Sequence, residues 1–226
     1  MNTTVKLVNL WASYEANHPL ADIADFCRHY LITERQQTIG GDLFNGEKPP
    51  RPDIALTKLM DRFSRLHMIY VQMALEDLEI DHFGEFNLLS AIANLHTPRK
   101  TEVIYHTLNE LSTGLNLLAG MKKKGYFIEW DDLEDKRSKR LKLTPLGEQI
   151  LQTCYTTFSK IPEMLFMEID RSDIEVCLQL LKNVEIKFSG LWQNHKSKAF
   201  ATVYSTITGK ADEEGAANGI NNDNQL

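Results

Sequence analysis

The strongest constraint on the fold is the stretch of residues 126–150, in which the spacing of apolar residues changes twice. "YFIEW" (126–130) and "KRLKLT" (139–144) have the two-residue period of strands, and in the second the leucines alternate with basic residues. The charged run "DDLEDKRS" between them is then the loop of a β-hairpin. We therefore expect an exposed hairpin that projects from a helical body.

Helical patterns flank this hairpin on both sides. Thr144 and Pro145 are typical of a helix start, because a threonine hydroxyl can cap the first turn and proline suits the first helical position. Three shorter patterns precede the hairpin, at residues 83–96, 100–109 and 111–125. Three helices followed by a two-stranded hairpin are the plan of a winged helix-turn-helix, which binds DNA in many proteins and other proteins in some.

The rest of the chain divides by composition. Residues 40–52 ("GGDLFNGEKPPRP") hold three glycines and three prolines, which predicts a linker. We expect these parts: a helical extension at 1–39, a main domain at 53–208 with a winged core at 83–144 and long flanking helices at 54–80 and 145–196, and a disordered tail at 209–226. Pro162 predicts a kink or break in the second flank. The fold class is therefore mainly α, with a β wing.

Charge is unevenly distributed along the 226 residues. The net charge of −6 argues against a protein that wraps nucleic acid with its whole surface. Residues 97–142 nevertheless hold ten basic and seven acidic side chains, an excess of +3, which leaves −9 for the remainder. The basic residues are thus concentrated where a winged helix would need a nucleic-acid surface.

Motifs for catalysis or membrane insertion are missing from the sequence. No phosphate-binding glycine loop, nucleophile elbow or metal-ligand spacing occurs, so we expect neither an enzyme nor a bound metal or cofactor. No run of about 18 apolar residues and no export signal is present, which predicts a cytoplasmic location.

Three cysteines are widely spaced, which suits a reducing compartment. Cys154 and Cys177 lie in apolar helical stripes, and we expect both to act as packing residues. Cys27 stands beside Arg28 and His29, whose charges could stabilise a thiolate, so a redox-sensing role for this residue is kept as an alternative.

"MKKKGYFIEWDDLEDKRSKRLKLTPLGEQIL" (121–151) resembles the wing of the MarR family of bacterial transcription regulators. The resemblance rests on the end of the recognition helix (Met121 to Gly125), on Asp-Lys-Arg in the wing (135–137), and on Leu-Thr-Pro-x-Gly-Glu after it. It is specific over residues 83–152, and the flanking helices extend it to about 54–196.

The resemblance implies a function in transcription regulation. In that family the flanking helices of two subunits form a homodimer, which binds a near-palindromic operator in double-stranded DNA. Half-sites then lie about one helical turn, ~10 bp, apart. Small phenolic or lipophilic ligands, bound between the dimerising helices and the winged domain, or oxidation of a cysteine, release the DNA.

The same resemblance implies roles for individual residues. Ser112 and Thr113 match the polar start of the recognition helix, which meets phosphate, and Asn116 stands where a base-contacting residue is common. Arg137 matches the arginine that reaches the minor groove, and Asp135 the carboxylate that steadies it. The predicted DNA-binding set is Arg99, Lys100, Ser112, Thr113, Asn116, Lys122, Lys123, Lys124, Arg137, Lys139 and Arg140, with Asp135 as the wing-supporting residue.

Two features of the segment favour another use of the same fold. Gly114 and Gly120 lie inside the recognition helix, where each costs about 1 kcal/mol relative to alanine, and the middle of the helix ("LNLLAG") is apolar. The wing also carries four acidic residues in "DDLED". A winged-helix module that binds a protein instead of an operator is therefore the alternative hypothesis.

Overall fold

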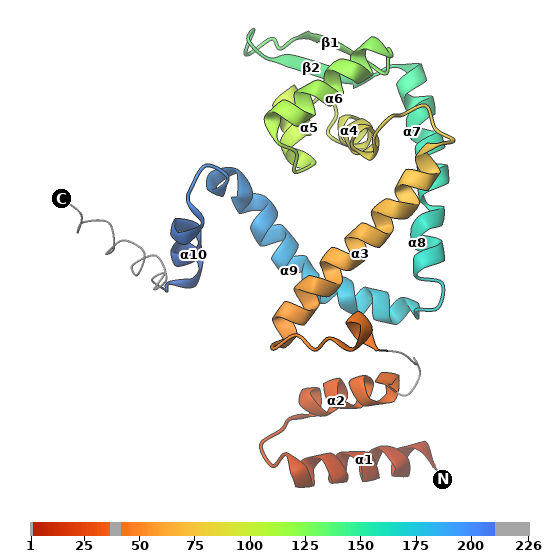
Figure 1. Cartoon of the computed structure of the whole chain (residues 1–226), viewed down its shortest axis with the longest axis vertical. Coiled ribbons are helices and arrows are strands. Elements are labelled where there is room, and N and C mark those ends of the chain that lie inside the picture. Colours follow the sequence, from red (N-terminus) through yellow and green to blue (C-terminus); the bar gives the residue numbers. More distant parts are fainter. Residues whose placement is uncertain (1, 37–41, 211–226) are drawn as a thin grey trace, which may run out of the picture. The chain divides into compact units, whose positions relative to one another are not determined.

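The computed structural model describes residues 2–36 and 42–210, which form two compact units, Met1–Arg62 and Phe63–Leu226 (Figure 1). The division falls inside one long helix, α3 (Pro52–Leu75), which starts at the end of the predicted linker. Most of the predicted tail, residues 211–226, lies outside the described residues.

The first unit begins with a helical hairpin. α1 (Thr3–Asn17) and α2 (Ile23–Gln36) confirm the two helices predicted within residues 5–34. Trp11 packs edge-on against Phe26 with ring centroids 5.3 Å apart, and Phe26 is the one buried side chain among those described in these two helices. So few buried side chains give the hairpin little core of its own.

A short 3-10 turn, η1 (Leu43–Gly46), occupies part of the predicted linker. Phe44 and Asn45 both have left-handed backbones, with φ of 58° and 56°, an arrangement that costs roughly 1–3 kcal/mol per residue. The Phe44 ring is buried beneath the Lys58 ammonium, 4.9 Å from the ring centroid, and Lys58 also pairs with Glu47 at 2.5 Å. This part of the linker is therefore folded onto the start of α3.

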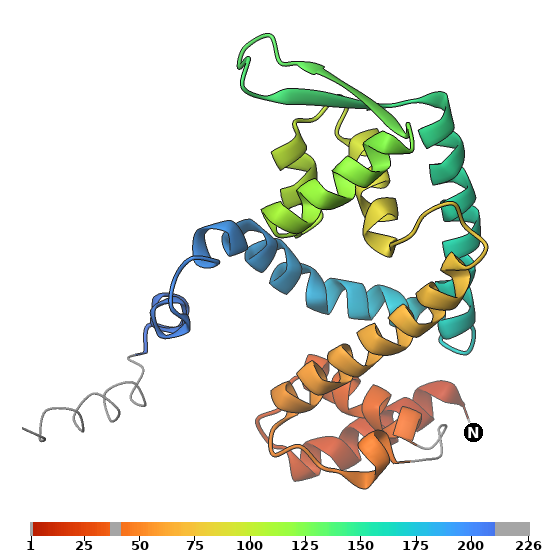
Figure 2. The same cartoon turned by 45° about the horizontal axis from the view of Figure 1, so that its top comes forward.

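The second unit contains the predicted winged core. Its elements are α4 (Phe83–Asn94), α5 (Lys100–His106), α6 (Leu111–Lys123), β1 (Phe127–Asp131) and β2 (Lys139–Leu143). The strands are antiparallel, with Phe127 opposite Leu143 and Asp131 opposite Lys139. Figures 1 and 2 show the hairpin along one edge of the three helices, with its tip extending past them. The fold class predicted from the sequence is confirmed.

A single hydrophobic core joins these elements. Its fully buried side chains are Val71, Leu88, Leu89, Val103, Ile104, Met121, Leu141 and Cys154, which come from α3, α4, α5, α6, β2 and α7 (Pro145–Phe158). The alternation in the second strand is explained by this packing, since Leu141 and Leu143 face the core while Lys142 faces solvent.

The junction of the hairpin with α7 is held by hydrogen bonds between Thr144 and backbone groups and by a close backbone contact at Gly147. Thr144 caps α7 as predicted: its Oγ1 accepts a hydrogen bond from the Gly147 N–H (3.1 Å) and donates one to the Gly125 carbonyl (2.7 Å). The Thr144 N–H also donates to the Tyr126 carbonyl at 3.0 Å. A Cβ on Gly147 would lie 1.9 Å from that carbonyl oxygen, so only glycine fits there.

The helices that follow α7 are far more exposed than the core. α7 ends at Phe158, and α8 (Lys160–Leu165) follows at once, so the predicted break comes just before Pro162, which lies inside α8. α9 (Arg171–His195) and α10 (Phe200–Thr208) complete the described chain, and the sequence did not predict α10 as a separate helix. All 25 residues of α9 are described, and none of them is buried.

The cysteines divide between core and surface. Cys154 is buried, and burial raises the pKa of its thiol to about 11, which suits an inert packing residue. Cys27 and Cys177 are exposed. The packing role predicted for Cys177 is therefore not met within the single chain, although its neighbours on α9 are apolar. Among the described residues, no helix is long and apolar enough to cross a membrane.

Candidate nucleic-acid interface

The exposed face of α6 is mostly polar. Ser112, Asn116 and Lys123 are exposed and lie on one stripe of the helix, and Thr113 is exposed beside its first turn. The first backbone N–H groups of a helix have no partner within the helix, and Glu110, the residue before α6, makes no side-chain cap. An anion can therefore meet these N–H groups together with the two hydroxyls.

The apolar middle of α6 faces the core only in part. Leu118 is buried, Leu117 packs against the core, and Leu115 is exposed. Gly114 is also explained by packing: a Cβ there would lie 2.6 Å from the Ile104 side chain. At Gly120, by contrast, a Cβ would meet no described atom within 4 Å beyond its own helix backbone, so this glycine has no packing role.

Two of the predicted lysines are bound to one carboxylate. Glu129 of β1 accepts Lys122 Nζ at 2.7 Å and Lys100 Nζ at 2.6 Å. Burial raises the pKa of Glu129, but hydrogen bonds from the two lysines outweigh it, and the net pKa is lowered. Glu129 therefore joins α5, α6 and the first strand of the wing.

Lys124 is directed toward the helices and away from the exposed face of α6. Its Nζ lies 2.8 Å from Asp81 and 3.1 Å from the buried carboxylate of Glu85. Burial lowers the pKa of Lys124, but its hydrogen bonds to Asp81 and Glu85 outweigh this effect and raise it overall. The pair leaves no uncompensated charge in the core.

The base of the wing loop, directly after β1, is a buried charge cluster centred on Asp132. This carboxylate is only 2% exposed, and its Oδ2 accepts Nε of Arg99 at 2.8 Å and Nε of Arg140 at 2.7 Å. Its Oδ1 accepts the backbone N–H of Glu134 at 2.9 Å. The hydrogen bond from Arg99, followed by the others, holds the pKa of Asp132 well below its usual range.

The tip of the wing presents an exposed cation. The Arg137 side chain is 96% exposed, and its Nε lies 3.5 Å from Asp135. Asp135 holds the turn itself, because it accepts the Ser138 hydroxyl at 2.9 Å and the Arg137 N–H at 3.1 Å. The Ser138 hydrogen bond is the main cause of the lowered pKa of Asp135. Lys139, the first residue of β2, pairs with Asp131, the last residue of β1, across the hairpin.

The structure thus divides the predicted DNA-binding set into two groups. The exposed group is Ser112, Thr113, Asn116, Lys123 and Arg137. Of its two cations, Lys123 makes no ion pair within the described residues, and Arg137 lies 3.5 Å from Asp135. Arg99, Lys100, Lys122, Lys124, Lys139 and Arg140 are bound to carboxylates of the same chain.

Sequence reasoning missed Asp132, Glu129 and Glu85, which organise the second group. In the sequence, two of them looked like surplus negative charge near the wing. The hairpin register could have signalled one pairing, since it places Asp131 opposite Lys139. The described part of the chain contains no group of three His, Cys, Asp or Glu side chains that could hold a metal ion.

Comparisons with known proteins bear on the fold. No protein-family model and no curated protein matches the sequence. Among solved structures, a mutant MarR from E. coli complexed with operator DNA matches with a TM-score of 0.54 and 22% identity, over 64% of this chain and 99% of that chain. The chain has the MarR-type fold.

Two further structures agree. Bordetella bronchiseptica BpsR, solved in a study of how 6-hydroxynicotinic acid regulates its DNA binding, matches at a TM-score of 0.52 and 18% identity over 57% of this chain and 97% of its own. A MarR transcriptional regulator from Methanosarcina mazei Go1 matches at 0.53 and 21% identity, over 58% and 96%. Each match spans nearly all of the MarR-type structure, while more than a third of this chain lies outside it.

Proposed function

We propose that this chain is a DNA-binding transcription regulator that acts as a homodimer on a near-palindromic site. The observation that carries the proposal is the exposed face of α6, which combines an uncapped N-terminus, two hydroxyls, Asn116 and Lys123, next to a wing whose tip presents Arg137. In a winged helix-turn-helix these are the two surfaces that meet DNA.

Each exposed residue has a role in this proposal. Ser112, Thr113 and the first N–H groups of α6 bind a phosphate, and Asn116 reads an adenine edge in the major groove. Lys123, further along the helix, binds a second phosphate. Arg137 enters the neighbouring minor groove, where the negative potential favours an arginine.

The ion-paired residues support that surface in two ways. Arg99 and Arg140 fix the base of the wing through Asp132, and Lys124 fixes the end of α6 through Glu85. We assign these three to positioning. Lys100, Lys122 and Lys139 keep part of their side chains exposed, so they add positive potential along the α6 and wing surface.

A homodimer is supported by the apolar surface of the flanking helices. Val176, Leu180 and Val184 lie on one stripe of α9, and Leu180 is 71% exposed. Contiguous exposed apolar surface of this kind marks an interaction site, and a two-fold axis lets the same stripe cover itself. Two α6 helices related by that axis bind half-sites about 10 bp apart.

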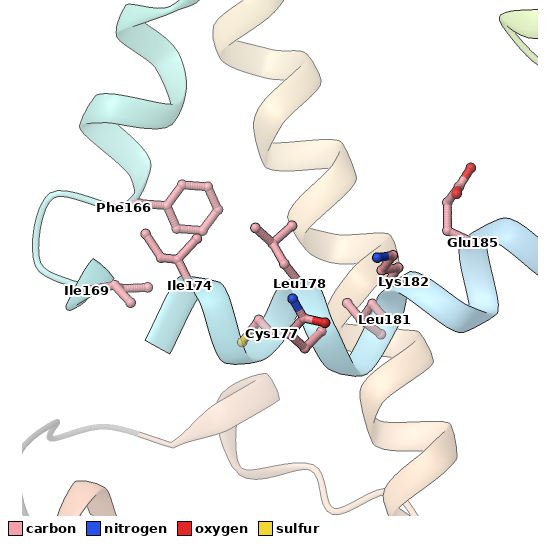
Figure 3. A pocket seen from close by; sticks show the side chains of 9 residues that line it. Phe166, Ile169, Ile174, Cys177, Leu178, Leu181, Lys182 and Glu185 are labelled. Atoms are coloured by element: carbon pink, nitrogen blue, oxygen red, sulfur yellow. The ribbon is translucent and has the colours of Figure 1, made fainter. Parts of the chain in front are cut away.

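A ligand site is also available on the flank. A groove of about 560 Å³, here called the α9 groove, is lined mainly by Phe166, Ile174, Cys177, Leu178 and Leu181. Figure 3 shows Ile174 and Leu178 projecting from α9 toward the side on which Phe166 lies, with Lys182 and Glu185 further along the helix. Its lining suits a small lipophilic or phenolic ligand, whose binding would change the lobe spacing.

One observation favours a protein-binding module as the second candidate. Leu133 at the wing tip is 96% exposed, and Leu111 and Leu115 are exposed on α6. Apolar side chains on both surfaces would suit a protein partner. A redox-sensing regulator remains a third candidate, on the exposed Cys27 and Cys177.

The deciding experiment is capture of fragmented host genomic DNA by the full chain at physiological salt, with Arg137→Ala and Lys123→Ala beside it. Lys160→Ala, an exposed lysine on α8, is the matched control. We expect a few discrete near-palindromic sites. Arg137→Ala should weaken binding to these sites by about 1–3 kcal/mol. Lys123→Ala should reduce the slope of log affinity against log salt concentration by about one.

Equal capture of all fragments with no effect of Arg137→Ala, or capture of none, would contradict operator binding. If the chain instead retains a partner protein at both low and high salt, and Leu133→Ser no longer retains it, the protein-binding module is supported. Release of DNA by peroxide that Cys27→Ser or Cys177→Ser abolishes would support the redox regulator.

A further inference from the structure

A second groove lies within the winged unit, at the junction of β2 with α7. It has a volume of about 440 Å³ and is bounded by the end of α4, the turn after it, β2 and α7 as far as Tyr155. Ile92, Leu143 and Leu151 are buried core residues that form its apolar floor. This β2 groove shares no lining residue with the α9 groove.

Two opposite charges line the β2 groove without pairing. Lys142 is on the exposed face of β2 and Glu148 is in the first turn of α7, and both are exposed. Within the described residues, neither side chain makes an ion pair, with the other or with a third group. The positive N-terminal end of α7 stabilises the negative charge of Glu148, but it does not stabilise the positive charge of Lys142.

The remaining wall of the groove is a strained turn. His96 and Thr97 line the groove and are two consecutive non-glycine residues with left-handed backbones, φ 49° and 59°. Such residues gather at ligand clamps and switch regions. The Thr97 carbonyl accepts Nη1 of Arg140 at 3.1 Å, and Arg140 in turn holds Asp132. The wall of the groove is thus joined to the base of the wing.

We propose that the β2 groove binds a small zwitterion with an apolar side chain, the chemistry of an apolar α-amino acid. Its carboxylate pairs with Lys142, its ammonium group pairs with Glu148, and its side chain covers Ile92, Leu143 and Leu151. A zwitterion can pair with Lys142 and Glu148 at once. A simple acid would pair only with Lys142, and a simple amine only with Glu148.

Occupancy also acts on the wing, a step that rests on the proposed DNA-binding function. A ligand seated against Thr97 changes the turn whose carbonyl holds Arg140, and Arg140 and Arg99 share Asp132. The ligand therefore biases the orientation of the hairpin that carries Arg137.

The binding step is tested without DNA, by methyl NMR of the full chain with L-phenylalanine as the probe. We expect saturable shifts of the Ile92, Leu143 and Leu151 methyl signals. 3-Phenylpropionate and 2-phenylethylamine, which each keep one charge of the zwitterion, should bind at least ten-fold more weakly.

Matched variants assign the two charges. In Lys142→Met, phenylalanine should bind no better than phenylethylamine, and in Glu148→Gln no better than phenylpropionate. Lys136→Met and Glu134→Gln, exposed charges on the wing loop, are the controls and should bind phenylalanine as the parent does. Circular dichroism confirms that each variant is folded.

Several outcomes would overturn the site: no saturable shift, equal binding of the three probes, or shifts confined to Leu178 and Leu181 in the α9 groove. The effect on the wing is measured as DNA affinity with and without phenylalanine at fixed salt. A change of three-fold or more that Lys142→Met abolishes supports coupling, and an unchanged affinity overturns it. A chain that binds no DNA refutes the proposed function, while the methyl shifts still decide the site.

Discussion

The winged core and α9 both contain many apolar side chains, but only the winged core buries them within the single chain. In the core, residues such as Leu118, Met121 and Leu141 are fully enclosed by helices and strands of the same chain. In α9, a described helix of 25 residues, no side chain is buried, and Leu180 is 71% exposed.

This difference separates two kinds of stability. The core is complete within one chain, so its packing and ion pairs should set the unfolding free energy of the monomer. The apolar stripe of α9 gains little until a second surface covers it, and its contribution should therefore depend on protein concentration. Changes in the core and in α9 should consequently be read by different measurements.

The largest loss should come from adding a single methyl group at the hairpin–α7 junction. Gly147→Ala places a Cβ 1.9 Å from the Tyr126 carbonyl oxygen, so the strand or the helix must move. We expect the unfolding free energy, measured by urea titration, to fall by about 3 kcal/mol or more. Leu146→Ala, next to it and exposed, is the control, and equal stability of the two variants would refute the clash.

The two glycines of α6 should respond in opposite directions. Gly114→Ala meets the Ile104 side chain at 2.6 Å and should cost roughly 1–3 kcal/mol of unfolding free energy. Gly120→Ala meets nothing and should add up to about 1 kcal/mol, through helix propensity. A shift of the same sign in both denaturation midpoints would show that α6 does not pack on α5 as described.

The Asp132 cluster should make core stability depend on pH. Because its folded pKa is lowered, Asp132 stabilises the fold above its unfolded pKa of about 3.9, and this contribution is lost as pH falls below that value. Asp132→Asn should thus lower the denaturation midpoint at pH 7, with a smaller difference from the parent at pH 3. Glu163→Gln, an exposed carboxylate on α8, serves as control. A constant difference at both pH values would contradict the charged cluster.

Substitution in α9 should barely change the monomer. Leu180→Asp should alter the unfolding free energy at low protein concentration by no more than about 0.5 kcal/mol, because the side chain is exposed. In sedimentation equilibrium, the same change should weaken self-association ten-fold or more, since it places a charge in the apolar stripe. Asn183→Asp, on the same helix, is the matched control, and a monomeric parent would refute the dimer.

Thiol reactivity compares the two regions without changing either. Cys154 has a buried thiol with a pKa raised to about 11, so Ellman's reagent should modify it only after unfolding. Cys27 and Cys177 should react in the native state. If α9 pairs in the dimer, the reaction of Cys177 should slow as protein concentration rises, while that of Cys27 should not.

Local patterns in the sequence were enough to predict the winged fold. The hairpin, the Thr144 cap and the order of the helices follow from short-range rules of period and capping. The Asp132 cluster could not be predicted in this way, since Arg99 and Asp132 are 33 residues apart and their pairing depends on how the hairpin lies against α5. The same limit applies to Lys124 and Glu85, 39 residues apart.

The exposed part of the candidate site followed the sequence more closely than the paired part. Ser112, Asn116 and Lys123 share a stripe because helical spacing alone decides which residues align. Whether a basic side chain points to solvent or to a carboxylate depends on tertiary packing, which the count of charges in 97–142 does not contain. The sequence therefore overestimated the number of free cations.

Because Gly147 contacts Tyr126 so closely, the hairpin and α7 should move together as one rigid body. With the helix backbone resting directly on the end of the strand, no side chain is left between them to absorb a rotation. α7 is about 21 Å long, so tilting it by about 10° at its far end would carry the hairpin junction roughly 4 Å. Any event that repositions the flanking helices would thus also displace the wing tip and its exposed Arg137.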